Sequence, residues 1–202
     1  MAIDRIDWHS GGDFPKGLAH VNGGTHIGFY LTWILEKDFQ GELHRDENGR
    51  EEIMKVLSNQ ISGRDFLINQ CDEKFWLEDL NTEGQAFTTY YYVDNSEPSY
   101  LSDYSELFLG TYENIYFIDD SSDNYNQVKE MISRRIGLFN KKQYLEEELS
   151  KPFSPAFIHG CFMFFKTVDF INLKGFDERY FLYMEDADIC REIKQSGKEI
   201  LY

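Results

Sequence analysis

Three carboxylates near the end of the chain are the residues best suited to chemistry. Glu185, Asp186 and Asp188 follow an aromatic run and lie at the start of a predicted helix. A carboxylate in this position can act as a general base and take the proton from an attacking hydroxyl group. The structural alternative is that the three side chains cap the helix, because the helix dipole favours negative charge at its N-terminus.

A second set of candidate residues lies near the start of the chain. His9, His26 and Asp13 carry the imidazole and carboxylate groups that bind metal ions such as zinc. Their spacing contains no HxH or HxxxH pair. Trp8 and Trp33 nearby predict a packed aromatic cluster in which the histidines bond to neighbouring groups. We therefore expect no metal or other cofactor in this chain, with a metal site at these three residues and a polar ligand pocket as the two alternatives.

The first 142 residues, which contain His9, Asp13 and His26, are predicted to be mostly helical. Apolar residues recur at helical spacing after residues that can cap a helix. The pattern predicts helices at 25–37 with Thr25 as the cap, from 62 toward 71, at 81–92, at 100–109, and from 121–123 to 136. Segment 114–118 is interpreted as a strand, and segments 11–12, 23–24, 46–49 and 95–98 as loops. We expect the region around Trp8, Trp33 and Phe66 to lie in the core.

Residues 143–202 differ in pattern from the first 142, and they begin with a charged segment. Residues 143–155 are predicted to be a linker, helical at first and then broken by Pro152 and Pro155. The apolar run 156–165 predicts a buried strand, and residues 199–202 are typical of the beginning of another. Between them, the pattern predicts a short helical turn at 167–173 and a helix at 185–196 that ends at Gly197.

Composition and charge exclude several classes of protein. The chain has 202 residues, 42% of them hydrophobic, and a formal charge of −16. Such acidity disfavours nucleic-acid binding and suits docking on a basic protein partner. The sequence shows no signal peptide and no apolar segment long enough to span a bilayer. Three cysteines without a CxxC pair favour buried thiols in the reducing cytoplasm.

The end of the chain resembles family 2 glycosyltransferases, in particular the rhamnosyltransferase-like group. The resemblance covers about residues 150–202 and rests on the blocks His159-Gly-Cys-Phe-Met163, Gly175-Phe-Asp-Glu-Arg179 and Tyr183-Met-Glu-Asp-Ala-Asp-Ile-Cys-Arg191. It implies that Asp186 is the general base and that Glu185 orients it or the acceptor. His159, Asp177 and Asp188 would then lie on the acceptor side. The resemblance also implies a nucleotide-sugar donor and a divalent metal, Mg²⁺ or Mn²⁺, in the parental enzyme.

That family holds its donor in a Rossmann-like half that ends in a separate Asp-x-Asp. In this chain Asp186-Ala-Asp188 is the only Asp-x-Asp, and no unit of strand, glycine-rich loop and helix precedes it. We therefore interpret residues 156–202 as a truncated α/β (GT-A-like) fragment that transfers no sugar by itself. The alternative is an inverting glycosyltransferase of surface polysaccharide synthesis that another chain completes, which would supply the nucleotide-sugar site.

Residues 1–142 resemble a family of small uncharacterised bacterial proteins. The resemblance rests on Asp7-Trp8-His9, Thr25-His26-Ile27 and Ser62-Gly-Arg64-Asp65-Phe66, with segments 71–74 and 78–87. It implies no known activity. The expected fold class is therefore α+β, with a mainly α-helical domain at 1–142, a linker at 143–155 and a glycosyltransferase segment at 156–202. The expected function is a fusion of an acidic binding or interaction module with an incomplete transferase.

Overall fold

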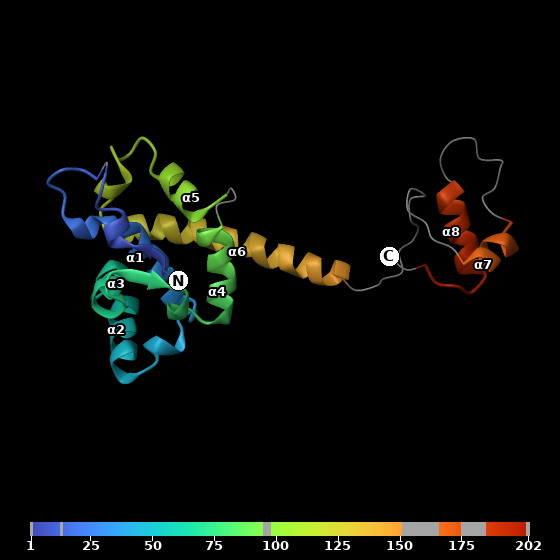
Figure 1. The fold of residues 1–202 in the computed structure, drawn as a ribbon, viewed down its shortest axis with the longest axis horizontal. Helices are drawn as coiled ribbons and strands as arrows, with labels where there is room; N and C mark the ends of the chain where they lie inside the picture. The colour runs from blue at the N-terminus through green and yellow to red at the C-terminus, as the bar shows by residue number, and fades with distance from the viewer. Residues whose placement is uncertain (1, 13, 95–97, 151–165, 175–184, 201–202) are drawn as a thin grey trace. The chain divides into compact units, whose positions relative to one another are not determined.

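The computed structural model describes residues 2–12, 14–94, 98–150, 166–174 and 185–200 (Figure 1). The chain divides into two compact units, residues 1–140 and 141–202, and each is described by itself. Most described residues are helical, and the named strands form one two-stranded sheet. Within the described segments, every helix is too short or too polar to cross a membrane.

Helix α1 (Thr25–Glu36) is the central element of the first unit. Ten of its 12 residues are buried, so the whole helix is enclosed by other elements rather than only one face. The sequence predicted this helix, but the N-cap is Gly24 and not Thr25. The Thr25 hydroxyl group instead accepts a hydrogen bond from the Arg64 guanidinium group at 3.0 Å. The Thr25 side chain was expected to cap α1, but it forms a contact with another helix instead.

Four further helices begin in this unit, close to the starts that the sequence predicted. They are α3 (Gly63–Cys71), α4 (Thr82–Thr88), α5 (Tyr100–Leu107) and α6 (Ser122–Ser150). Ser62, Asn81 and Ser99 are the N-caps of α3, α4 and α5, and each side chain accepts a hydrogen bond from a backbone N–H group in the first turn. After α4 the chain continues as a π-helical turn, η5 (Thr89–Val93).

Three element assignments in this unit are wrong. The segment 23–24, interpreted as a loop, ends the short 3₁₀ helix η2 (His20–Gly24). The segment 46–49, interpreted as a loop, begins helix α2 (Glu47–Leu57), and the Asp46 carboxylate caps it by accepting from the Gly49 backbone N–H at 2.7 Å. The segment 114–118, interpreted as a strand, contains the short 3₁₀ helix η6 (Ile115–Phe117). The Asn114 side chain accepts a hydrogen bond from the Tyr116 backbone N–H, so a local cap overrides the β propensity of this segment.

The sheet pairs the start of the chain with the segment after α3, and neither strand was predicted. Strand β1 (Ala2–Arg5) is antiparallel to β2 (Lys74–Trp76). Ala2 pairs with Trp76 and Asp4 with Phe75, so the register shifts by one residue between Ala2 and Asp4. A bulge of this kind bends the strand and redirects a side chain. The Asp4 side chain is buried at this position.

The core of the first unit is mainly aromatic. The Tyr30 ring contacts four other rings at centroid distances of 4.9 to 6.3 Å, those of Trp33, Phe75, Tyr92 and Tyr100. Trp33 and Phe66 are fully buried, as the sequence predicted, but Trp8 is 57% exposed. Trp8 ends the short 3₁₀ helix η1 (Ile6–Trp8), in which Ile6 takes the buried position. The assignment of Trp8 to the core was therefore wrong.

Three more 3₁₀ helices connect these elements: η2 (His20–Gly24), η3 (Glu42–His44) and η4 (Leu77–Asp79). Gly24 of η2 precedes α1 directly, and η3 leads into α2. His44 is the last residue of η3, and Asp79 is the last residue of η4.

The second unit contains two predicted helices among its described residues, α7 (Thr167–Asn172) and α8 (Glu185–Gln195). Gly197 has a φ of +76°, which confirms it as the predicted helix stop. The predicted strand 156–165 lies outside the described residues. Residues 199 and 200 are not in a strand, contrary to the prediction for 199–202. The α/β glycosyltransferase fragment therefore remains a prediction.

Candidate functional site

The buried carboxylate of Asp4 is the centre of a polar site in the first unit. Its Oδ1 accepts hydrogen bonds from the Arg5 backbone N–H and from His9 Nε2, each at 2.7 Å. Its Oδ2 accepts from His26 Nε2 at 3.0 Å and from the Tyr92 hydroxyl group at 2.6 Å. The donors come from β1, the loop after η1, α1 and η5. This one side chain therefore joins four separate parts of the chain.

The two histidines of the site differ in their exposure to solvent. The side chains of His26 and Asp4 are 2% and 5% exposed, whereas His9 is 17% exposed. The imidazole rings lie edge to face with centroids 4.5 Å apart. His9 Nδ1 lies 3.2 Å from the Tyr116 hydroxyl group, and the Tyr100 hydroxyl donates to the His26 carbonyl oxygen at 2.7 Å. The site is therefore most exposed to solvent at His9.

The electrostatics of the site keep Asp4 ionised. Burial raises the pKa of Asp4, but hydrogen bonds from His26 and His9 outweigh burial and hold this pKa well below its usual range. Burial lowers the pKa of His26, although the nearby Asp4 carboxylate opposes that effect. Burial and the charge of Asp4 raise the pKa of the Tyr92 hydroxyl group. At neutral pH the site therefore combines an ionised carboxylate with a neutral His26.

The structure brings together two of the three residues that the sequence singled out near its start. His9 and His26 meet, while Asp13 lies outside the described residues. Asp4 supplies the carboxylate instead, and sequence reasoning missed it. One signal was present: Asp4 stands between Ile3 and Ile6 in a short segment that forms a strand, where an acidic residue at a buried position needs a partner.

A second cluster of potential ligands is fully buried. His44, Cys71 and Asp79 each offer a ligand atom, and these atoms lie within 4.8 Å of one another. His44 Nε2 donates to Asp79 Oδ1 at 2.9 Å, and Asp79 Oδ2 accepts from the Trp76 backbone N–H at 2.6 Å. Burial and the charge of Asp79 raise the pKa of the Cys71 thiol. Cys71 is therefore protonated at neutral pH, which makes it a poor nucleophile.

The described residues include only part of the site that the glycosyltransferase resemblance implies. Asp188 is 8% exposed and forms an ion pair with Arg191, three residues later in α8. The backbone of residues 185 and 186 begins α8, as the sequence predicted. The side chains of Glu185 and Asp186 lie outside the described part of the chain, as do His159 and Asp177. Their roles in catalysis and acceptor binding therefore remain predictions.

Comparison with known proteins assigns the first part of the chain. A family model described as a domain of unknown function, DUF7832, matches residues 2–118, which is more than half of the chain. The chain belongs to the DUF7832 family. The Asp4 site and the His44 cluster both lie within the matched residues of this domain.

A second match concerns a glycosyltransferase. The chain is 31% identical over 72 residues to the rhamnosyltransferase WbbL of Escherichia coli (strain K12). These residues make up 36% of this chain and 27% of the relative, so the chain spans about a quarter of that protein. No solved structure matches the chain.

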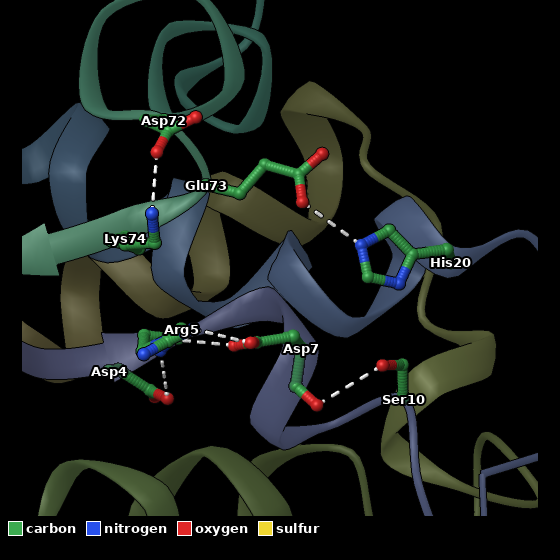
Figure 2. Close-up of polar contacts among 8 residues, drawn as sticks. All are labelled: Asp4, Arg5, Asp7, Ser10, His20, Asp72, Glu73 and Lys74. Carbon is green, nitrogen blue, oxygen red and sulfur yellow. Dashed lines mark hydrogen bonds and ion pairs between the residues drawn. The ribbon is translucent and has the colours of Figure 1, made fainter.

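Three separate polar pairs lie at and beside the sheet of the DUF7832 domain (Figure 2). They are Arg5 with Asp7, Lys74 with Asp72, and His20 with Glu73. Arg5 and Lys74 are paired across the two strands. The Arg5 guanidinium group also lies over the exposed Trp8 ring, 5.6 Å from its centroid. We call Arg5, Asp7, Trp8, Asp72 and Lys74 the Trp8 surface.

Proposed function

We propose that the DUF7832 domain is a binding module that docks on a basic protein through the Trp8 surface. The observation that carries this proposal is the exposed Trp8 ring with the Arg5 guanidinium group over it. Tryptophan and arginine are enriched at the centres of protein interfaces and among the residues that contribute most binding energy. The charge of −16 supports a basic partner, because complementary charge speeds association and excludes acidic competitors.

Titratable groups away from the Asp4 site, buried or partly buried, support a binding role over a catalytic one. The carboxylate of Asp103 is held by the Arg135 guanidinium group at 2.6 and 2.7 Å and by the Tyr91 hydroxyl at 2.6 Å. Asp79 is satisfied by His44 and by the Trp76 backbone N–H. Such groups hold the fold together and offer little hydrogen-bonding capacity to a substrate.

Quantitative co-purification from the native host tests the docking proposal. The full chain and the variants Trp8→Ala and Leu109→Ala are compared, because Leu109 is also exposed, at 82%, but lies outside the Trp8 surface. We expect a defined basic protein that is enriched by the unmodified chain and by Leu109→Ala, and that Trp8→Ala fails to retain. The same proteins bound equally by all three chains, or no enriched protein, would reject the proposal.

We further propose that the C-terminal segment descends from the acceptor side of a family 2 glycosyltransferase and transfers no sugar in this chain alone. The identity with the rhamnosyltransferase supports the descent. The sequence contains no second Asp-x-Asp to hold a metal-bound nucleotide donor. A general base contributes only when donor and acceptor are already held in attacking geometry. The chain is thus proposed to be a fusion of a binding module with an incomplete transferase segment.

A working glycosyltransferase completed by another chain is the second candidate, and the same match favours it. Calorimetric titration of the full chain with Mn²⁺ and a panel of nucleotide sugars separates the two. No binding is expected if the segment is incomplete. Saturable binding, with sugar transfer that is lost in Asp186→Asn, would establish the enzyme instead.

We propose a cytoplasmic location on the basis of the cysteines. Cys71 is a buried free thiol, which suits a reducing compartment. Cys161 lies outside the described residues. Fractionation of the host cells with an antibody to this chain checks the location.

A further inference from the structure

We propose that Asp4, His9 and His26 form a binding site for a divalent transition-metal ion, with Zn²⁺ as the first candidate. The potential ligand atoms of the three side chains lie within 4.8 Å of one another. Two imidazole nitrogens and one carboxylate oxygen are a ligand set that proteins use for zinc, with a fourth position left to water. The inference is independent of the proposed docking surface.

The distances between the side chains suit an ion placed between them. His9 Nε2 and His26 Nε2 lie 2.7 and 3.0 Å from the two oxygens of Asp4. In a tetrahedral site, ligand atoms that are each about 2.0–2.2 Å from a zinc ion lie about 3.3–3.6 Å from one another. A separation of these atoms by about 0.3–0.9 Å, with the proton of each Nε2 passing to Nδ1 of the same ring or to solvent, would therefore replace the two hydrogen bonds by coordination. The two imidazole nitrogens already face the Asp4 carboxylate, one toward each of its oxygens.

The surrounding contacts are those that hold metal ligands in position. The Tyr92 hydroxyl group and the Arg5 backbone N–H donate to the oxygens of Asp4. His9 Nδ1 lies within hydrogen-bond distance of the Tyr116 hydroxyl group, which leaves Nε2 to face the ion. Outer contacts of this kind fix the ring orientation and the tautomer of ligating histidines. The three ligands thus have defined orientations before any ion binds.

Burial gives the site a closed side and an open side. Asp4 and His26 are almost fully buried, whereas 17% of the His9 side chain is exposed. His9 follows the short 3₁₀ helix η1 and lies on the more exposed side of the site. An ion would enter past His9, and a water ligand would lie on the same side.

The His44–Cys71–Asp79 cluster is a weaker candidate and a useful internal control. All three of its residues are buried, and Asp79 already accepts the backbone N–H of Trp76 that begins η4. A metal bound there would use the Cys71 thiolate. Cobalt bound by a thiolate shows an intense near-ultraviolet charge-transfer band that nitrogen and oxygen ligands do not produce, so the two sites can be told apart.

The test uses the full chain, without an affinity tag and after treatment with a chelator. It is titrated calorimetrically with Zn²⁺ alone against a background of excess Mg²⁺, which occupies weak acidic sites. Co²⁺ is then added to a second sample for spectroscopy. We expect one Zn²⁺ per chain, no thiolate band with Co²⁺, loss of binding in His9→Ala, and unchanged binding in the matched variant Cys71→Ala.

A second variant covers the case in which His9→Ala fails to fold. Tyr116→Phe keeps all three ligands but removes the outer contact of His9, and we expect it to weaken Zn²⁺ binding about 10–100-fold. The absence of saturable Zn²⁺ binding by the unmodified chain would overturn the proposal and leave Asp4 as the centre of a hydrogen-bonded triad. Binding that survives His9→Ala, or that is lost in Cys71→Ala, would also overturn it.

Discussion

Helices α1 and α3 of the DUF7832 domain approach each other closely at two glycines. A Cβ atom on Gly28 of α1 would lie 2.4 Å from the backbone nitrogen of Arg64 in α3, and one on Gly63 would lie 2.1 Å from the Gly28 carbonyl oxygen. The contacting atoms belong to the backbone and cannot rotate away. The two helices therefore need glycine at both positions to keep their present distance.

We predict that Gly28→Ala destabilises the domain although it raises the helix propensity of α1. Overpacking of this kind costs about 1–3 kcal/mol in the free energy of unfolding. Gly137→Ala is the matched control, because a Cβ at Gly137 in α6 meets nothing within 4 Å; it should stabilise by about 1 kcal/mol. Urea unfolding measures both, and equal effects of the two variants would contradict the packing argument.

Because Asp103 forms an ion pair with Arg135, we predict that the free energy of unfolding of the domain decreases at acid pH. Burial raises the pKa of Asp103, but hydrogen bonds from Arg135 and Tyr91 outweigh burial, so the pKa of Asp103 in the folded protein lies below its ordinary value of 3.8. The unfolded chain then binds more protons in this range, and the stabilisation is present above pH 3.8 and is lost as the pH falls toward the folded pKa.

Asp103→Asn should therefore cost about 1.5–3 kcal/mol at neutral pH, and the difference from the unmodified chain should shrink below about pH 4. Unfolding by urea at a series of pH values measures this. The matched control is Glu130→Gln, since Glu130 and Arg134 form an exposed pair with side chains 75% and 80% exposed, which contributes about 0–1 kcal/mol. If the difference in the free energy of unfolding between Asp103→Asn and the unmodified chain stays constant across the acid range, the lowered pKa of Asp103 is refuted.

Individual residues show how far the sequence could predict the candidate site. His9 and His26 were identified from their side-chain chemistry, which needs no structure. Asp4 was missed because its burial depends on pairing with Phe75, about 70 positions away, and on the bulge before it. Trp8 was misplaced because hydrophobicity alone does not show which residue of a short 3₁₀ helix faces the core.

At the level of elements, helix starts were predicted best where one side chain makes a local cap. Ser62 and Asn81 act within three residues, so their effect is visible in the sequence. The segment from Asp46 to Gly49 was misassigned because aspartate and glycine favour turns as much as helix starts. Strands β1 and β2, of four and three residues, are too short to show periodicity, and their pairing is long-range.

Helix α6 belongs to the core of the DUF7832 domain although the family match ends at residue 118. Ile132 and Val128 are fully buried, and Tyr125 is 9% exposed. We predict that Ile132→Ala lowers the free energy of unfolding by about 2–5 kcal/mol. Leu138→Ala on the same helix is the control, because Leu138 is 57% exposed and should change stability by less than about 0.5 kcal/mol. Thermal unfolding compares them, and similar losses would mean that α6 packs differently.

At the scale of the whole molecule, the first unit should fold without the second. Its hydrophobic core, as described, contains no residue beyond Phe139, and the unit ends at Asn140. A chain of residues 1–140 should therefore keep a cooperative thermal transition close to that of the full chain. A chain of residues 1–118 matches the family but lacks Tyr125, Val128 and Ile132, so it should expose apolar surface and unfold at a lower temperature or associate. Calorimetry and light scattering on both chains measure this. A 1–118 chain as stable as 1–140, or a 1–140 chain without a transition, would show that the domain ends elsewhere.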